Sequence, residues 1–389
     1  MQSPAFVPEP DADALAHSQA LAARIRAEID AAGGWISFAR YMDLALYAPG
    51  LGYYAAGAAK FGAAGDFVTA PEISGLFGAT LARQVAQVLQ ASSPQVLEFG
   101  AGTGKLAADL LNVLGEACAG YAILEPSPDL RQRQAATLRR LAPEACAKVR
   151  WLDTLPAQFS GCIVANEVAD AMPVHLLHFA GEAVDERGVT LDAAGAFTYA
   201  DRPAQGALLA AARALAVEDR DDYLTEINLA ARAWVATLAG CLSSGAALLI
   251  DYGFPAREYY HPQRHRGTLM CHYRHHAHDQ PFSFPGLADI TAHVDFSALA
   301  DAAEEAGLDL LGYTSQASFL LDCGITDLLA AVPAEDSARY LPLANQANRL
   351  LSPAEMGELF KVMLLGRGAI ADPITNPIGF RSNNRARRL

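Results

Sequence analysis

Two kinds of hydrophobic pattern take turns along the chain from residue 91 onwards. Short apolar runs typical of buried strands are separated by longer segments in which apolar residues recur at helical spacing. The strand-like runs lie at 95–99, 121–125, 149–152, 162–166, 246–251, 308–313 and 360–368, and the main helical segments at 105–114, 129–141, 223–240 and 296–307. This alternation predicts an α/β fold, in which helices cover both faces of a mostly parallel sheet.

Other segments interrupt this pattern. Residues 175–200 have the turn-separated runs of antiparallel strands, and most of 315–359 is helical. At the N-terminus we expect one helical stretch from Ser18 through Tyr47 and another over 74–91. The predicted organisation is an N-terminal tail and helical region (1–90), the first half of the α/β core (91–174), an antiparallel insertion (175–222), the second half of the core (223–314), a helical insertion (315–359), and a last strand with a basic tail (360–389).

Composition limits the possible partners and compartments. The 389 residues carry a formal net charge of −14, which disfavours sequence-independent binding of nucleic acid. Six scattered cysteines without a CxxC pair indicate reduced thiols, and the N-terminus has neither signal-peptide nor transit-peptide features. No apolar run reaches membrane-spanning length, so we expect a cytoplasmic protein without membrane insertion. The basic RSNNRARRL end is interpreted as a solvated tail before a docking element.

The segment QVLEFGAGTGKL at 95–106 has a strand, a glycine-rich turn and a helix start. It is not a Walker A loop, because Phe99 stands where the first glycine should be and Leu106 follows Lys105. It also lacks the third glycine of the dinucleotide fingerprint. What remains is an ExGxGxG loop formed by Glu98, Gly100, Gly102 and Gly104.

This loop still has the properties of a nucleoside site. Glycines permit positive φ and close approach of a ligand, and the helix beyond offers free N–H groups. Glu125 ends the next strand, 21 residues after Gly104, where an acidic residue can accept both ribose hydroxyls. Without a pyrophosphate site, S-adenosylmethionine fits, and Glu98 can orient its ammonium group. The further residues predicted to bind the cofactor are Thr103, Pro126, Ser127, Asn166 and Asp153, the last near the adenine N6.

Two of these interpretations have structural alternatives. The glycine loop could be a plain turn between strand and helix, although Glu125 at the expected spacing favours a cofactor. Asp153 could equally be a simple turn residue.

Several longer motifs occur in order and resemble the MidA family, also called the complex I assembly factor 7 family. They are GDFVTAPEISGLFG (65–78), LEFGAGTGKLAADLL (97–111), ANEVADAMPVH (165–175), IDYGFP (250–255), RGTLMCHY (266–273), PGLADITAHVDF (285–296) and MGELFKVMLL (356–365). The resemblance implies a class I S-adenosylmethionine-dependent methyltransferase without a metal. In the mitochondrial branch it implies methylation of a protein arginine during complex I assembly, hence a protein substrate such as a respiratory-complex subunit. The chain departs from the family at Val168 and Ala169, where bulky or aromatic residues are usual.

The ANEVADAMP motif supplies the candidate catalytic groups. Asn166 and Glu167 end a predicted parallel strand, at the sheet edge where open α/β folds bind ligands. Methyl transfer mainly requires alignment of acceptor and methyl group, and a guanidinium needs carboxylates that grip it. We predict Glu167 as the leading acceptor-orienting carboxylate and Asp170 as its partner, with helix capping as the alternative for Asp170.

Two further segments have a functional and a structural interpretation. In GDFVTAPEIS, Thr69 and Glu72 are expected near the cofactor together with Asp66, although either Thr69 or Glu72 could cap the following helix. Asp251 and Tyr252 are expected to face the same cavity, with packing as the alternative.

The remaining alternatives concern metal binding and function. The cysteine and histidines at 271–278 fit no standard metal-site spacing, so we expect no metal there. Besides arginine methylation, the chain could methylate a small molecule or act as a cofactor-binding assembly chaperone without turnover.

Overall fold

A computed structural model of the chain describes residues 8–55, 69–215, 217, 221–368 and 376–389. Its main sheet has the strand order β15-β16-β10-β5-β2-β3-β4, with β14 added beside β10. The strands β4, β3, β2, β5 and β10 are mutually parallel, whereas β16 runs antiparallel to both β10 and β15. This confirms the predicted α/β fold of class I methyltransferase type. The strand bounds are β2 Gln95–Phe99, β3 Gly120–Leu124, β4 Val149–Leu152, β5 Phe159–Asn166, β10 Leu242–Phe254, β14 Val294–Asp295, β15 Asp309–Ser315 and β16 Phe360–Arg367.

Helices cover both faces of this sheet because its strand side chains alternate between two apolar cores. Val96 and Leu248 point into one core, and their neighbours Leu97 and Leu249 into the other. The first face is covered by α4 (Gly75–Ala91), α5 (Lys105–Leu114), α6 (Pro128–Leu141), α11 (Gln316–Asp322), α12 (Ile325–Ala330) and α13 (Ser337–Leu351), and the second by α8 (Leu229–Cys241) and α10 (Phe296–Glu305).

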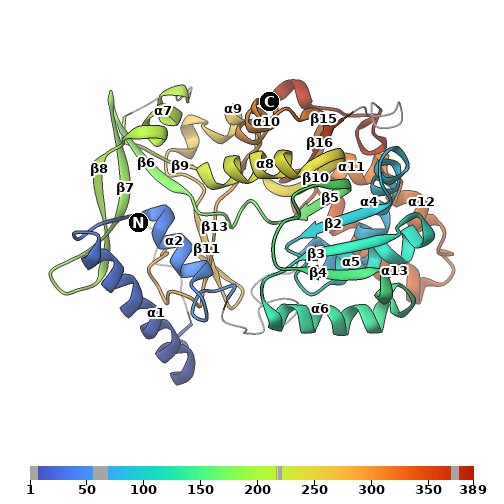
Figure 1. The fold of residues 1–389 in the computed structure, drawn as a ribbon, viewed down its shortest axis with the longest axis horizontal. Helices are drawn as coiled ribbons and strands as arrows, with labels where there is room; N and C mark the ends of the chain where they lie inside the picture. The colour runs from blue at the N-terminus through green and yellow to red at the C-terminus, as the bar shows by residue number, and fades with distance from the viewer. Residues whose placement is uncertain (1–7, 56–68, 216, 218–220, 369–375) are drawn as a thin grey trace.

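A second, antiparallel sheet forms the other lobe, at the left of Figure 1. As predicted for 175–200, its strands β6 (His175–Ala180), β7 (Ala183–Leu191) and β8 (Phe197–Pro203) pair antiparallel. The helices α1 (Ala12–Ala31) and α2 (Phe38–Tyr47) pack on this lobe and not on the main sheet. Smaller elements there are β1 (Ile36–Ser37), α7 (Gly206–Ala214), α9 (Ala256–Tyr259) and a three-stranded sheet of β11 (Met270–Tyr273), β12 (His276–His278) and β13 (Asp289–Thr291).

Three boundaries differ from the sequence predictions. The predicted helix 223–240 begins with a strand, β9 (Tyr223–Ile227), which pairs with β6, and the helix starts only after Asn228, whose side chain accepts the N–H of Ala231. The predicted continuous N-terminal helix is divided by Gly33 and Gly34, both at positive φ. The helix α1 also starts earlier than expected, because Asp11 caps it.

The basic C-terminal segment is docked, so its interpretation as a solvated tail is wrong. The N–H of Arg385 donates to the carbonyl of Tyr313 at 2.6 Å, and the Arg385 guanidinium pairs with Glu358. Phe380 is buried against Phe319. The segment is therefore anchored along β15 and α11.

Among the helices that the structure describes, none has the length and apolar character needed to span a bilayer.

Candidate functional site

The glycine loop lies at the topological switch point of the main sheet, where the chain leaves β2 towards β3 and later returns beside β2 as β5. Gly100, Gly102 and Gly104 all have positive φ, of 62°, 53° and 83°. A Cβ added at Gly102 would meet no atom within 4 Å, so this glycine faces open space that a ligand can fill. The helix α5 starts here without a side-chain cap, which leaves backbone N–H groups for a ligand.

A polar chamber of about 60 Å³ lies beside the loop. The residues predicted to bind the cofactor that line it are Thr69, Glu72, Glu98, Gly100, Gly102, Thr103 and Asn166, with Glu167 beside them. Burial raises the pKa of Glu98 to about 7, although the hydrogen bond from the Tyr121 hydroxyl, at 2.8 Å, opposes this shift. The Thr103 hydroxyl donates to Glu72, and this bond joins the loop to the segment before α4. Such a chamber suits the amino-acid end of S-adenosylmethionine.

A larger cavity of about 670 Å³ borders the same loop and is lined by Glu125, Pro126 and Ser127. One Glu125 oxygen accepts the N–H of Ser127 at 2.9 Å, and the other accepts the side chain of Gln134 at 3.2 Å. Each carboxylate oxygen can accept a further hydrogen bond, so Glu125 can still bind ribose hydroxyls. Burial raises its pKa.

Asp153 does not line either cavity. Its largely exposed carboxylate pairs with Arg131 at 2.7 Å. A contact between Asp153 and the adenine stays a prediction that this placement does not favour.

Part of the lining of the larger cavity is acidic and aromatic. This part comprises Tyr47, Tyr54, Glu167, Asp170, Tyr252 and Asp289. Glu167 follows β5 at a positive φ of 52°, a strained conformation for a residue with a side chain. Burial, with the nearby Asp170 charge, raises the pKa of Glu167 to about 7. Burial likewise raises the pKa of Asp170 to about 6, while the Tyr252 hydroxyl lowers it.

Asn166, which lines the chamber beside the glycine loop, and Asp170, which lines the larger cavity, each have a buried oxygen without a hydrogen-bond partner among the described residues. Asn166 also donates to the Glu167 carboxylate at 3.0 Å. Unsatisfied buried acceptors of this kind are costly, so they fit a site that receives donors from a ligand.

Sequence reasoning missed Asp289, Tyr47 and Tyr54. The Tyr54 hydroxyl donates to Asp289 at 2.8 Å, and the Tyr47 and Tyr54 rings stack with centroids 5.5 Å apart. Asp289 opens the DITAHVDF part of a family motif, which was the available signal for this residue. The tyrosines lie in ALYAPGLGYY, outside the motifs that carry the family resemblance. Neither segment follows a strand of the main sheet, and only tertiary packing brings them to the site.

The other candidates separate clearly. Tyr252 lines the cavity as expected, whereas Asp251 lies buried beneath the loop that follows β5. Thr69 precedes the short helix α3 (Ala70–Ile73) but makes no side-chain capping hydrogen bond, and it lines both cavities. The following helix α4 is capped by Ser74. Asp66 lies outside the described residues.

The histidine-rich segment forms the β11–β12 hairpin, in which Cys271 is paired with His278. Burial lowers the pKa of His272 to about 4. Within the described parts of the chain, no group of three or more His, Cys, Asp or Glu side chains is arranged to hold a metal.

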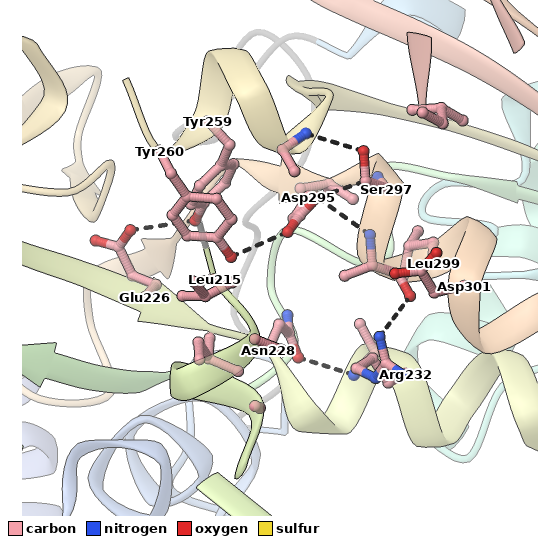
Figure 2. Close-up of a pocket in the computed structure, with 18 of the residues that line it drawn as sticks. Leu215, Glu226, Asn228, Arg232, Tyr259, Tyr260, Asp295, Ser297, Leu299 and Asp301 are labelled. Atoms are coloured by element: carbon pink, nitrogen blue, oxygen red, sulfur yellow. Dashed lines mark hydrogen bonds between the residues drawn. The ribbon is translucent and has the colours of Figure 1, made fainter. Parts of the chain in front are cut away.

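A second cavity, of about 1,030 Å³, lies between α7, α8, α9 and α10 (Figure 2). Its buried acidic groups already have partners: Glu226 accepts from Tyr259 at 3.1 Å, and Asp295 accepts from Tyr260 at 2.9 Å. We therefore place the chemistry in the 670 Å³ cavity that borders the glycine loop, although this second cavity is larger.

The open face of Gly102 generates a direct prediction. Gly102→Val should weaken binding of S-adenosylhomocysteine by roughly tenfold or more, because the new side chain occupies the ligand's space and the backbone there is unfavourable for a residue with a Cβ. Calorimetric titration measures this. Gly181→Val is the matched control, since Gly181 also has a positive φ, of 64°, and open space around its Cβ position, but lies in the β6–β7 turn. Equal affinity losses in both variants would contradict the assignment.

Comparisons with known proteins show the family of the chain. Residues 80–314 match the sequence model of the Methyltransf_28 family, described as S-adenosyl-L-methionine-dependent methyltransferases. The zebrafish mitochondrial protein arginine methyltransferase NDUFAF7 is 31% identical, over 85% of this chain and 83% of that protein. The Drosophila melanogaster homologue is 31% identical, over 95% of this chain and 90% of that protein.

A solved structure of a COG1565 superfamily member from Burkholderia thailandensis, bound to S-adenosyl-homocysteine, is 54% identical and superposes with a TM-score of 0.93. The structural alignment covers 99% of this chain and 100% of the Burkholderia thailandensis chain. The segment that matches the Methyltransf_28 family model, residues 80–314, includes the glycine loop, Glu125, Glu167 and Asp170. The chain therefore belongs to this family of S-adenosylmethionine-dependent methyltransferases.

Proposed function

We propose that this methyltransferase transfers the methyl group to an arginine side chain of a protein substrate. The observation that carries the proposal is the group of three carboxylates, Glu167, Asp170 and Asp289, in the lining of the cavity that borders the glycine loop. Among the ion pairs of the described residues, none involves Glu167 or Asp170. The NDUFAF7 relatives, which are named protein arginine methyltransferases, support the same acceptor.

The chemistry of this pocket suits a guanidinium. A guanidinium is planar and permanently charged, and it binds carboxylates through paired N–H groups and stacks on aromatic rings. Glu167 and Asp170 provide the charge, while Tyr47 and Tyr54 provide stacked rings beside it. An apolar small molecule would leave these carboxylates without a cationic partner.

In this mechanism S-adenosylmethionine supplies an electrophilic methyl group at the sulfur. The chain's own residues do the rest of the work. Glu167 and Asp170 hold the guanidinium so that one nitrogen faces the glycine loop, and the walls of the cavity limit the access of water. Methylation also releases one N–H proton from the guanidinium, and a carboxylate with a pKa near 6 or 7 is suited to accept it.

A protein substrate and the compartment remain part of the proposal. We propose a respiratory-complex subunit as the substrate, on the family resemblance, and the cytoplasm as the compartment. The six cysteines are free thiols, which supports a reducing environment.

Removing either acceptor carboxylate should strongly lower turnover, and removing Asp170 should leave cofactor binding nearly unchanged. We expect Glu167→Gln and Asp170→Asn to lower methyl transfer from labelled S-adenosylmethionine into arginine peptides by about 100-fold. Affinity for S-adenosylhomocysteine should stay within about threefold for Asp170→Asn, because Asp170 does not line the chamber beside the glycine loop. Mass spectrometry of the peptides identifies the methylated residue. Methylation of a lysine, or of no peptide, would contradict the arginine assignment. If cells that carry Glu167→Gln assemble the protein's partner normally, a chaperone role would be favoured instead.

The raised pKa values predict an acid limb in the activity profile. Because Glu167 and Asp170 ionise only near pH 7 and pH 6, kcat/KM for an arginine peptide should rise by about tenfold or more between pH 5.5 and pH 8.

Folding stability should change with pH in the opposite direction. The folded carboxylates keep protons that the unfolded chain has already lost, so stability falls as pH rises through the folded pKa. Thermal melting of the wild type and of Glu167→Gln at both pH values measures this. An equal loss of stability in both proteins would contradict the assignment to Glu167.

A further inference from the structure

Asp251 is buried at the end of β10 and binds the loop that carries the acceptor carboxylates. Its Oδ2 accepts the backbone N–H groups of Val168, Ala169 and Asp170 at 3.1, 2.9 and 3.2 Å. Its Oδ1 accepts the N–H of Tyr252 at 2.9 Å. Only 3% of Asp251 is exposed.

This arrangement determines the shape of the loop after β5. Amides from three consecutive residues can reach one oxygen only if the chain curls around it, and the curl begins at Glu167 with its positive φ of 52°. The N–H of Glu167 is itself bound to the carbonyl of Ile250, the neighbour of Asp251, at 2.8 Å. Three hydrogen bonds converge on one buried oxygen of Asp251, so β10 holds the loop firmly against its conformational strain.

The side chains on the outer side of the curl point the other way. Glu167 and Asp170 line the cavity, whereas Asp251 lies under the backbone between them. We propose that Asp251 is a positioning residue of the methyltransferase: it does not touch the acceptor but sets where Glu167 and Asp170 hold it. This inference rests on the proposed function of those two carboxylates.

A second carboxylate, the half-buried Asp295, allows a positioning role to be distinguished from general stabilisation. Asp295 follows β14, which is paired with β10, and its Oδ1 accepts the N–H groups of Ser297 and Ala298 at the start of α10. It also accepts the Tyr260 hydroxyl, and it faces the second cavity (Figure 2). Asp295 therefore does the same structural work as Asp251 but holds no part of the acceptor loop.

The test compares Asp251→Asn with Asp295→Asn in the full chain. Three quantities are measured: affinity for S-adenosylhomocysteine, kcat and KM for an arginine peptide, and deuterium exchange of the amides at 168–170. For Asp251→Asn we expect kcat to fall about 100-fold with cofactor affinity within about threefold, and faster exchange at 168–170. For Asp295→Asn we expect kcat within about threefold of the wild type and slow exchange at 168–170.

Two results would overturn the inference. One is a kcat for Asp251→Asn within about threefold of the wild type, and the other is an equal loss of kcat in Asp295→Asn. If Asp251→Asn fails to fold, Asp251→Ser, which keeps an oxygen acceptor, takes its place with the same expected outcomes. If the wild type methylates no arginine, the proposed function fails by itself, and exchange at 168–170 that is unchanged in the Asp251 variant would then overturn the positioning role.

Discussion

Three carboxylates lie together on the cavity wall, and this group constrains the structure most. Two of the three have no cation partner among the described ion pairs. Glu167 and Asp170 sit side by side at the end of β5, and Asp289 joins them from β13. Burial raises the pKa of the first two, so ionising either carboxyl group inside the protein costs free energy. The rest of the fold must offset the unfavourable free energy of ionising such a carboxylate. Binding of a cationic ligand reduces this free energy.

The two lobes divide the work around this group. The main sheet supplies the glycine loop, Glu125 and the ends of β5 and β10, which together make the cofactor end and the floor of the cavity. The N-terminal helices pack with the second sheet in a separate core and bring Tyr47 and Tyr54 to the cavity lining. The common core thus supplies the glycine loop, Glu167, Asp170 and Tyr252, while the second lobe adds Tyr47, Tyr54 and Asp289.

Local sequence was sufficient for the core and for most of the cofactor end. The parallel strands, the helices between them and the antiparallel insertion could be predicted because their hydrophobic periods are regular, and the glycine loop because positive φ requires glycine. The start of α8 could not, since Tyr223–Ile227 becomes a strand only by pairing with β6. Asp289 and Tyr54 could not either, because they meet across 235 residues of sequence. Asp251 was predicted to end a central strand, but β10 continues to Phe254, and only the hydrogen bonds from Val168, Ala169 and Asp170 show that Asp251 points beneath the loop.

The most direct test of a single cavity with a cofactor end and a guanidinium end is the affinity of a bisubstrate analogue. In this analogue a guanidinium is joined by a short linker to the position that the transferred methyl occupies in an S-adenosylmethionine scaffold. The account predicts binding at least about 100-fold tighter than that of S-adenosylhomocysteine, because one molecule then fills both ends. It also predicts that this gain disappears in Asp170→Asn. An analogue that binds no tighter than S-adenosylhomocysteine would contradict the account.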